Sequence, residues 1–197
     1  MIARLARHLS RDTRGATIVE FALAAPLLLV AILGLFDLGH NMYTASVIHG
    51  AVQKAARDST IEGAADKAGT LDDRVTSAVR LIAPGATLEF DRAAYATFSE
   101  VAQPEDFTDV NANGICDANE PFEDANGNGN WDADAGKQGF GGARDAVLYT
   151  VAVTYNRPFP IAKLIGQPGT FTTTARTVLR NQPYGPQGSV KKTENCP

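Results

Sequence analysis

The hydrophobic pattern begins with one long helical segment. From Phe21 to Phe36 the chain carries sixteen residues without a charge. After Asp37, apolar residues recur at helical spacing, opposite a face of polar ones. These later apolar positions are Tyr43, Val47, Ile48, Ala51, Val52, Ala55 and Ala56. We therefore predict one helix over residues 16–58, apolar on all sides at first and amphipathic later.

Shorter elements follow this helix. Residues Leu71–Ile82 have a helical apolar stripe that Pro84 and Gly85 end. Apolar and polar residues alternate in Val147–Tyr155, which predicts a strand with one buried face. The other expected strands are Thr87–Phe90, Tyr95–Phe98 and Phe171–Leu179, the last as the antiparallel partner of Val147–Tyr155. Residues 182–197, with three prolines and two glycines, are predicted to be a flexible tail.

These elements predict an α+β fold in which a long N-terminal helix precedes a small antiparallel sheet. The expected organisation is a basic leader (1–15), a transmembrane and amphipathic helix (16–58), an extracytoplasmic α+β domain (59–181) with an acidic insert (105–137), and the tail.

Charge sets the expected orientation of the helix in a membrane. Four arginines and one aspartate lie in residues 1–15, and everything after about residue 40 is therefore expected outside the cytoplasm. A cleavable secretory signal is the alternative, but the stretch FDLGH after the apolar run has no small-residue cleavage site.

Glu20 stands at the edge of the apolar run, where a carboxylate is costly without a partner. The surrounding pattern R-G-A-T-I-V-E-F resembles the prepilin peptidase signature of type IV pilins. The resemblance implies cleavage between Gly15 and Ala16, which changes the net charge from −4 to −7. It also implies that Glu20, followed by Phe21, pairs with the N-terminal amine of a neighbouring subunit during assembly.

Residues 11–58 are similar to the TadE-like minor pseudopilins of the tight-adherence (Flp) pilus system. Pro26 in the apolar run, Gly39 and Tyr43 fit that family's pattern. The resemblance implies a pilin-like fold, a single-pass protein of the bacterial inner membrane, and a role in pilus assembly for surface attachment. The implied partners are prepilin peptidase, other pilins and pseudopilins, inner-membrane assembly proteins and the lipid bilayer.

The charge outside the leader is mostly acidic. A net charge of −4 argues against nucleic acid as a partner. Nine carboxylates and no lysine or arginine occur between Glu105 and Asp134. Within this insert, DVNANGICDANE places oxygen-bearing side chains at the spacing of a calcium-binding loop. The predicted ligands are Asp109, Asn111, Asn113, the Ile115 carbonyl, Asp117 and Glu120.

The stretch DANGNGNWDADA repeats this spacing fifteen residues later. Its predicted ligands are Asp124, Asn126, Asn128, Asn130 and Asp132. The closing position is Ala135, so Asp134 or Glu123 would have to substitute. We expect weak Ca²⁺ binding, and the alternative is a flexible polar loop, since Asp, Asn and Gly also favour turns.

Cys116 and Cys196 are either a disulfide, if the domain is exported, or two unrelated thiols. No catalytic residue is predicted, because His8, His40 and His49 lie in the leader or the first helix without catalytic partners at a recognisable spacing. We therefore expect a non-enzymatic protein. The alternative to a processed pilin is an uncleaved, membrane-anchored protein with a calcium-dependent, adhesin-like domain.

Overall fold

The structure is a computed structural model that describes residues 14–59, 68–117, 119–159, 161–164, 166–182 and 191–197. Residues 1–13 of the expected leader lie outside the described residues. The chain forms two compact units. The anchor unit comprises Met1–Met42 and Arg157–Gly169, and the sheet unit comprises Tyr43–Asn156 and Thr170–Pro197.

Helix α2 (Arg14–Ser59) matches the long helix predicted over residues 16–58 and contains Pro26 within it. Its first half is exposed, and large apolar side chains such as Leu23, Leu27 and Leu35 are 70–77% accessible. Among the described residues, α2 is the helix long and apolar enough to cross a membrane, and its most apolar stretch of 18 residues has a mean hydropathy of 2.5. None of this apolar stretch is buried within the described chain, unlike most of a core helix in a soluble domain.

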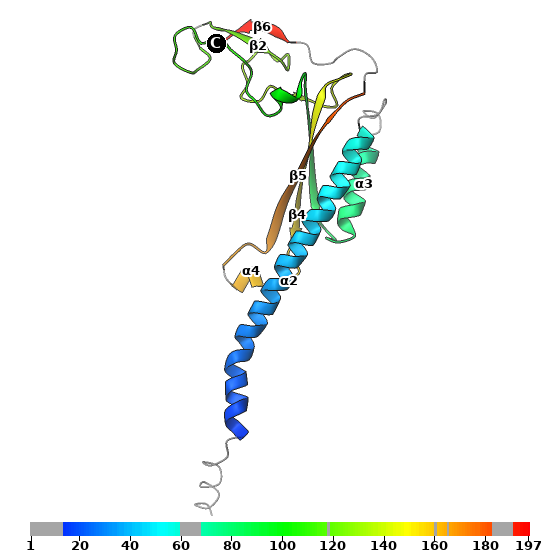
Figure 1. Ribbon diagram of the computed structural model, residues 1–197, viewed down its shortest axis with the longest axis vertical. Helices are drawn as coiled ribbons and strands as arrows, with labels where there is room; N and C mark the ends of the chain where they lie inside the picture. The colour runs from blue at the N-terminus through cyan, green and yellow to red at the C-terminus, as the bar shows by residue number, and fades with distance from the viewer. Residues whose placement is uncertain (1–13, 60–67, 118, 160, 165, 183–190) are drawn as a thin grey trace, which may run out of the picture. The chain divides into compact units, whose positions relative to one another are not determined.

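The sheet unit is built on four strands in the order β3-β1-β4-β5, all antiparallel to their neighbours (Figure 1). The strands are β1 (Thr87–Tyr95), β3 (Lys137–Gln138), β4 (Ala146–Asn156) and β5 (Thr170–Arg180). Val151 of β4 stands opposite Phe90 on one side and Ala175 on the other. The predicted pairing of residues 147–155 with 171–179 is confirmed.

One face of β4 forms the core of this unit. Its alternating Val and Tyr side chains are buried against the second half of α2 and against α3 (Ala68–Arg80). Ile48 and Val52 of α2 and Val75 and Val79 of α3 are each 1% exposed. The predicted stripe on α2 needs one correction, because Tyr43 is 60% exposed.

The insert has its own two-stranded sheet, in which β2 (Pro121–Asp124) pairs with β6 (Lys192–Asn195). The predicted flexible tail is therefore wrong for residues 192–195, while 183–190 lie outside the described residues. The strand predicted at Tyr95–Phe98 is also wrong. Strand β1 ends at Tyr95, and a short 3-10 helix, η2 (Phe98–Glu100), follows.

Candidate functional site

The residues expected to direct processing and assembly lie at the start of α2. Gly15 is helical and exposed, and a Cβ atom added there would meet no other atom within 4 Å. Glu20 is exposed on the same helix, and its neighbours Val19 and Phe21 are 59% and 68% exposed. Packing inside the fold therefore does not explain a glycine at position 15 or a carboxylate at position 20.

The second candidate site is the pair of loops in the insert. In the first loop (residues 109–120), Asp109 accepts hydrogen bonds from the N–H groups of Asn113 and Gly114, at 3.1 and 2.8 Å. Asn111 accepts from the same Asn113 N–H at 3.0 Å. The Asp117 carboxylate accepts from the side-chain amides of Asn111 and Asn113, both at 2.9 Å. Four of the five predicted side chains, all except Glu120, are thus joined to one another or to the backbone within one tight turn.

The second loop (residues 124–135) repeats these contacts. Asp124 accepts from the N–H groups of Asn128 and Gly129, at 3.2 and 3.0 Å. Asn126 accepts from the Asn128 N–H at 3.0 Å. Asp132 accepts from the side-chain amides of Asn126 and Asn128, at 2.7 and 2.6 Å. The sequence repeat is therefore also a structural repeat.

The two loops differ in the carboxylate that closes them. Glu120, the last residue of the first loop, accepts from the N–H groups of Val110 and Asn111 at 2.7 and 3.2 Å. In the second loop Glu105 fills the corresponding place and accepts from the N–H groups of Ala125 and Asp132, at 2.8 and 3.1 Å. Both carboxylates are buried, with Glu105 2% and Glu120 3% exposed.

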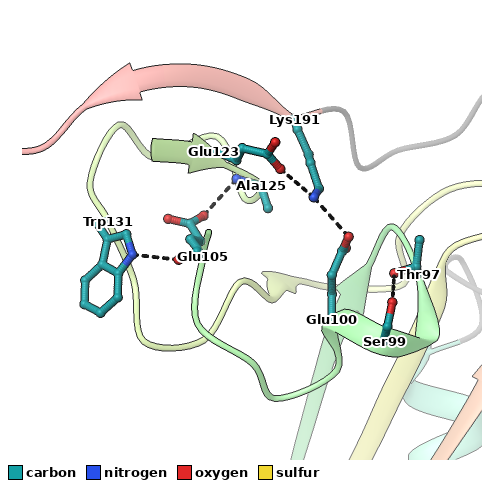
Figure 2. A network of polar contacts seen from close by, with 8 residues as sticks. All are labelled: Thr97, Ser99, Glu100, Glu105, Glu123, Ala125, Trp131 and Lys191. Atoms are coloured by element: carbon teal, nitrogen blue, oxygen red, sulfur yellow. Dashed lines mark hydrogen bonds and ion pairs between the residues drawn. The ribbon is translucent and has the colours of Figure 1, made fainter. Parts of the chain in front are cut away.

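Glu105 reaches the second loop because its own backbone runs beside it. The Glu105 N–H donates to the Asp132 carbonyl at 3.0 Å, and the Trp131 indole N–H donates to the Glu105 carbonyl at 2.8 Å (Figure 2). On the other side of this segment, the Glu123 N–H donates to the Asp106 carbonyl at 2.8 Å. The segment that carries Glu105 therefore lies between the second loop and β2.

Asp134 and Glu123, the expected substitutes for the closing carboxylate of the second loop, contact other residues instead. Asp134 accepts a hydrogen bond from the Tyr95 hydroxyl at 2.9 Å. Burial, together with this bond to Asp134, raises the pKa of Tyr95 to about 12. Glu123 is 2.7 Å from the Lys191 ammonium, which also lies 3.1 Å from Glu100 (Figure 2). The hydrogen bond to Glu123 is the main cause of a raised Lys191 pKa.

A disulfide joins Cys116 to Cys196, with a Cα–Cα distance of 5.4 Å. It lies in a small apolar cluster with Phe122, and Phe107 and Trp131 pack against this cluster. The rings of Phe107 and Trp131 meet edge to face at 5.9 Å. Because Cys116 is part of the first loop, the disulfide and β6 hold that loop against the C-terminal segment.

The donor set of the loops fits a hard cation. Ca²⁺ prefers six to eight oxygen ligands from carboxylates, amides and backbone carbonyls, and each loop offers Asp and Asn oxygens beside a buried Glu. In the described part of the chain, no three His, Cys, Asp or Glu side chains gather so that they could hold a metal ion by themselves. A cation in these loops would therefore also need the Asn side chains and backbone carbonyls as ligands, which calcium-binding loops use.

Sequence reasoning missed two members of the site. Glu105 lies nineteen residues before Asp124, so no local spacing connects them. Lys191 lies in the region predicted as a flexible tail, and β6 was missed for the same reason. The only signals were that Glu105 opens the acidic stretch and that Lys191 precedes the second cysteine by five residues.

Comparison with protein families gives a match for the N-terminal part of the chain. The family model described as TadE-like protein matches residues 15–57, which run from Gly15 almost to the end of α2. Comparisons with curated proteins and with solved structures gave no match. Over residues 15–57 the chain is therefore similar to TadE-like proteins, which agrees with the resemblance that the sequence motifs predicted.

Proposed function

We propose that this chain is a minor pilin or pseudopilin that takes part in assembling a tight-adherence pilus for surface attachment. The observation that carries the proposal is the TadE-like match over residues 15–57, which begins at Gly15. The exposed apolar half of α2 supports it, because such a helix needs lipid or other pilin helices around it. The N-terminus would remain cytoplasmic and the sheet unit would lie outside the inner membrane.

Processing by prepilin peptidase after Gly15 is the first part of this proposal. Gly15→Val should leave the leader attached, because a bulky side chain blocks entry of the backbone into a protease cleft. Gly34→Val is the matched control, since Gly34 lies in the same helix and its position is equally open. Mass spectrometry of the membrane fraction reads out the N-terminus. An intact Met1 in wild-type protein, in cells with an active prepilin peptidase, would favour the uncleaved adhesin-like alternative.

Assembly through Glu20 is the second part. The Glu20 carboxylate is proposed to pair with the freed amine of a neighbouring subunit, since neither charge is stable alone in hydrocarbon. Glu20→Ala should still insert and be cleaved, but should fail to co-purify with other pilins and inner-membrane assembly proteins. Glu89→Ala, on β1 of the sheet unit, is the control. Normal co-purification of Glu20→Ala would assign the carboxylate another role.

We also propose that the insert binds one or two Ca²⁺ ions weakly. In the first loop the ligands would be Asp109, Asn111, Asn113, the Ile115 carbonyl, Asp117 and Glu120. In the second loop they would be Asp124, Asn126, Asn128, the Asn130 carbonyl and Asp132, with Glu105 as the closing carboxylate. The matched contacts within the two loops support a common role.

Titration calorimetry of the full chain in detergent tests this part. Wild type should bind Ca²⁺ and should bind Mg²⁺ more weakly, because Mg²⁺ demands a smaller octahedral cage. Asp109→Asn and Asp124→Asn should each remove one site. Asp91→Asn, a carboxylate of β1 outside the loops, should leave binding unchanged. If titration of wild type with Ca²⁺ gave no heat of binding, the insert would be a polar loop held by its own hydrogen bonds.

A further inference from the structure

Residues 157–169, which connect β4 to β5, differ from the rest of the extracytoplasmic chain. They belong to the same compact unit as the first part of α2, whereas β4 and β5 themselves do not. Their sequence, RPFPIAKLIGQPG, contains two basic residues and no acidic one. This connecting segment is therefore basic and apolar, in contrast to the acidic insert.

Two contacts hold the connecting segment to the end of the apolar run of α2. Arg157 forms an ion pair with Asp37, and the side chains of these residues are 20% and 8% exposed. The Asn41 amide also donates to Asp37, at 3.3 Å. The rings of Phe36 and Phe159 stack with their centroids 6.1 Å apart. The segment is thus attached at the residues where the uncharged stretch ends.

This attachment places the segment at the boundary of a bilayer that α2 spans. The sixteen uncharged residues from Phe21 to Phe36 cover about 24 Å of helix, and the hydrocarbon core is about 30 Å thick. Phe36 and Asp37 therefore fall in the interfacial layer or just inside it. The ion pair with Arg157 neutralises the Asp37 charge there, which reduces the cost of a carboxylate at that depth.

The outer side of the segment carries the residue types that suit an interface. Leu164 is 72% exposed, and the next residue towards the N-terminus, Lys163, is also exposed. Ile161 and Ala162 face inward and are 8% and 4% exposed. Apolar and aromatic side chains partition into the headgroup boundary, while lysine places its ammonium at lipid phosphates.

We propose that residues 157–169 are a second membrane contact, with Leu164 in the acyl boundary and Lys163 at the phosphates of anionic lipids. The occupant of this surface is the bilayer that holds α2, because the segment is attached to α2 at Phe36 and Asp37, where the uncharged run ends. The inference rests on the membrane anchoring in the proposed function. It gives the chain two attachments to one leaflet, which restrict how the anchor unit can rotate.

Depth-dependent fluorescence quenching tests the proposal with the full chain in vesicles of phosphatidylcholine and phosphatidylglycerol. Leu164→Cys receives an environment-sensitive fluorophore, while Cys116 and Cys196 stay paired. Leu29→Cys, within α2, reports insertion of the anchor. Leu81→Cys is the matched control, since Leu81 is 85% exposed and lies in the sheet unit.

Lipids with a nitroxide near the headgroup should quench the label at position 164 and leave the label at 81 bright. Lys163→Gln should lower the membrane-inserted population of the segment by about fivefold in anionic vesicles. It should have no such effect in purely zwitterionic vesicles.

Three outcomes distinguish failure of the second membrane contact from failure of the α2 anchor. A quenched label at 29 with an unquenched, water-like label at 164 overturns the membrane contact and leaves the anchor intact. A label at 164 that is shifted to the blue but not quenched by lipid overturns it in favour of a protein neighbour. If lipids with a nitroxide deep in the acyl chain do not quench the label at 29, the anchor itself fails, and with it the basis of the inference.

Discussion

The two loops of the insert have the same residues at six matched positions and are closed by carboxylates of different origin. The first loop ends in its own closing residue, Glu120, and its leading aspartate, Asp109, is exposed. The second loop has Ala135 at the closing position and receives Glu105 from a preceding segment. Its leading aspartate, Asp124, is only 2% exposed.

This difference shows that a carboxylate is needed at one place in space rather than at one place in the sequence. The first loop is complete within twelve residues and is held from outside by the disulfide at Cys116. The second loop is complete only when the segment with Glu105 has packed beside it. Substitutions and the addition of calcium can test whether the first loop is held by its own residues and the second by the surrounding fold.

The largest effect is expected from the disulfide, which joins residues 80 positions apart. In the chain-entropy account, a crosslink over a loop of that size contributes about 4 kcal/mol to stability. Cys196→Ser should lower the free energy of unfolding in urea by up to that amount. Amide hydrogen exchange should rise more in the first loop, which contains Cys116, than in the second. Equal increases in the two loops would mean that the disulfide supports the whole insert rather than one loop.

The next largest effect is expected from substitution of the closing carboxylates. Glu120→Gln and Glu105→Gln each replace a buried, charged acceptor of backbone N–H groups, at a cost of about 2 kcal/mol. Glu120→Gln should loosen residues 109–117, and Glu105→Gln should loosen residues 124–132. Hydrogen exchange resolved to single loops measures both. If Glu105→Gln loosened the first loop as strongly as the second, Glu105 would support the insert in general and would not close one loop.

Calcium is expected to stabilise both loops, at ten times the dissociation constant by about 1.4 kcal/mol for each site. The melting temperature of the full chain in detergent should therefore rise with Ca²⁺ and fall in chelator. Glu105→Gln should remove only the contribution of the second loop, and Glu120→Gln only that of the first. Melting that is identical in calcium and in chelator would refute metal binding at these concentrations.

A smaller difference lies at the fourth position of each loop, where the backbone is left-handed. The first loop has Ala112 there, with φ +60°, and the second has Gly127, with φ +81°. A residue with a Cβ atom is disfavoured in this region by about 1 kcal/mol. Ala112→Gly should therefore stabilise the protein or leave it unchanged, and Gly127→Ala should destabilise it by about that amount. The urea midpoint should fall for Gly127→Ala and should not fall for Ala112→Gly. A lower midpoint for both variants would mean that the two backbones are not equivalent at this position.

The smallest effect is expected at Lys191, whose partners Glu100 and Glu123 are partly exposed. Lys191→Met should cost about 0.5 kcal/mol and should cost less at high salt. Since hydrogen bonding to Glu123 raises the Lys191 pKa, this contribution is present up to the ordinary lysine pKa and is lost as the pH rises above it. Unfolding measured against salt checks this, and a salt-independent loss would point to packing of the lysine stem.

The sequence by itself determined the features that depend on neighbours within a few residues. The uncharged run from Phe21 to Phe36 and the helical spacing after it predicted α2 almost to its ends. Alternation in residues 147–155 predicted β4 and its buried face, because side chains of a strand alternate between its two faces. The spacing of Asp and Asn in the two loops predicted the shared turn, since those contacts join residues at most six positions apart.

Only the tertiary structure decided the contacts that join distant parts of the chain. It brought Glu105 to the second loop, paired β6 with β2, and attached Arg157 to Asp37, 120 residues away. No local periodicity encodes such pairs, because they depend on which segments come to lie side by side after the chain has packed. The tail was predicted as flexible because its own residues lack a strand pattern, whereas β6 is held by a disulfide and by a partner strand more than sixty residues earlier in the chain.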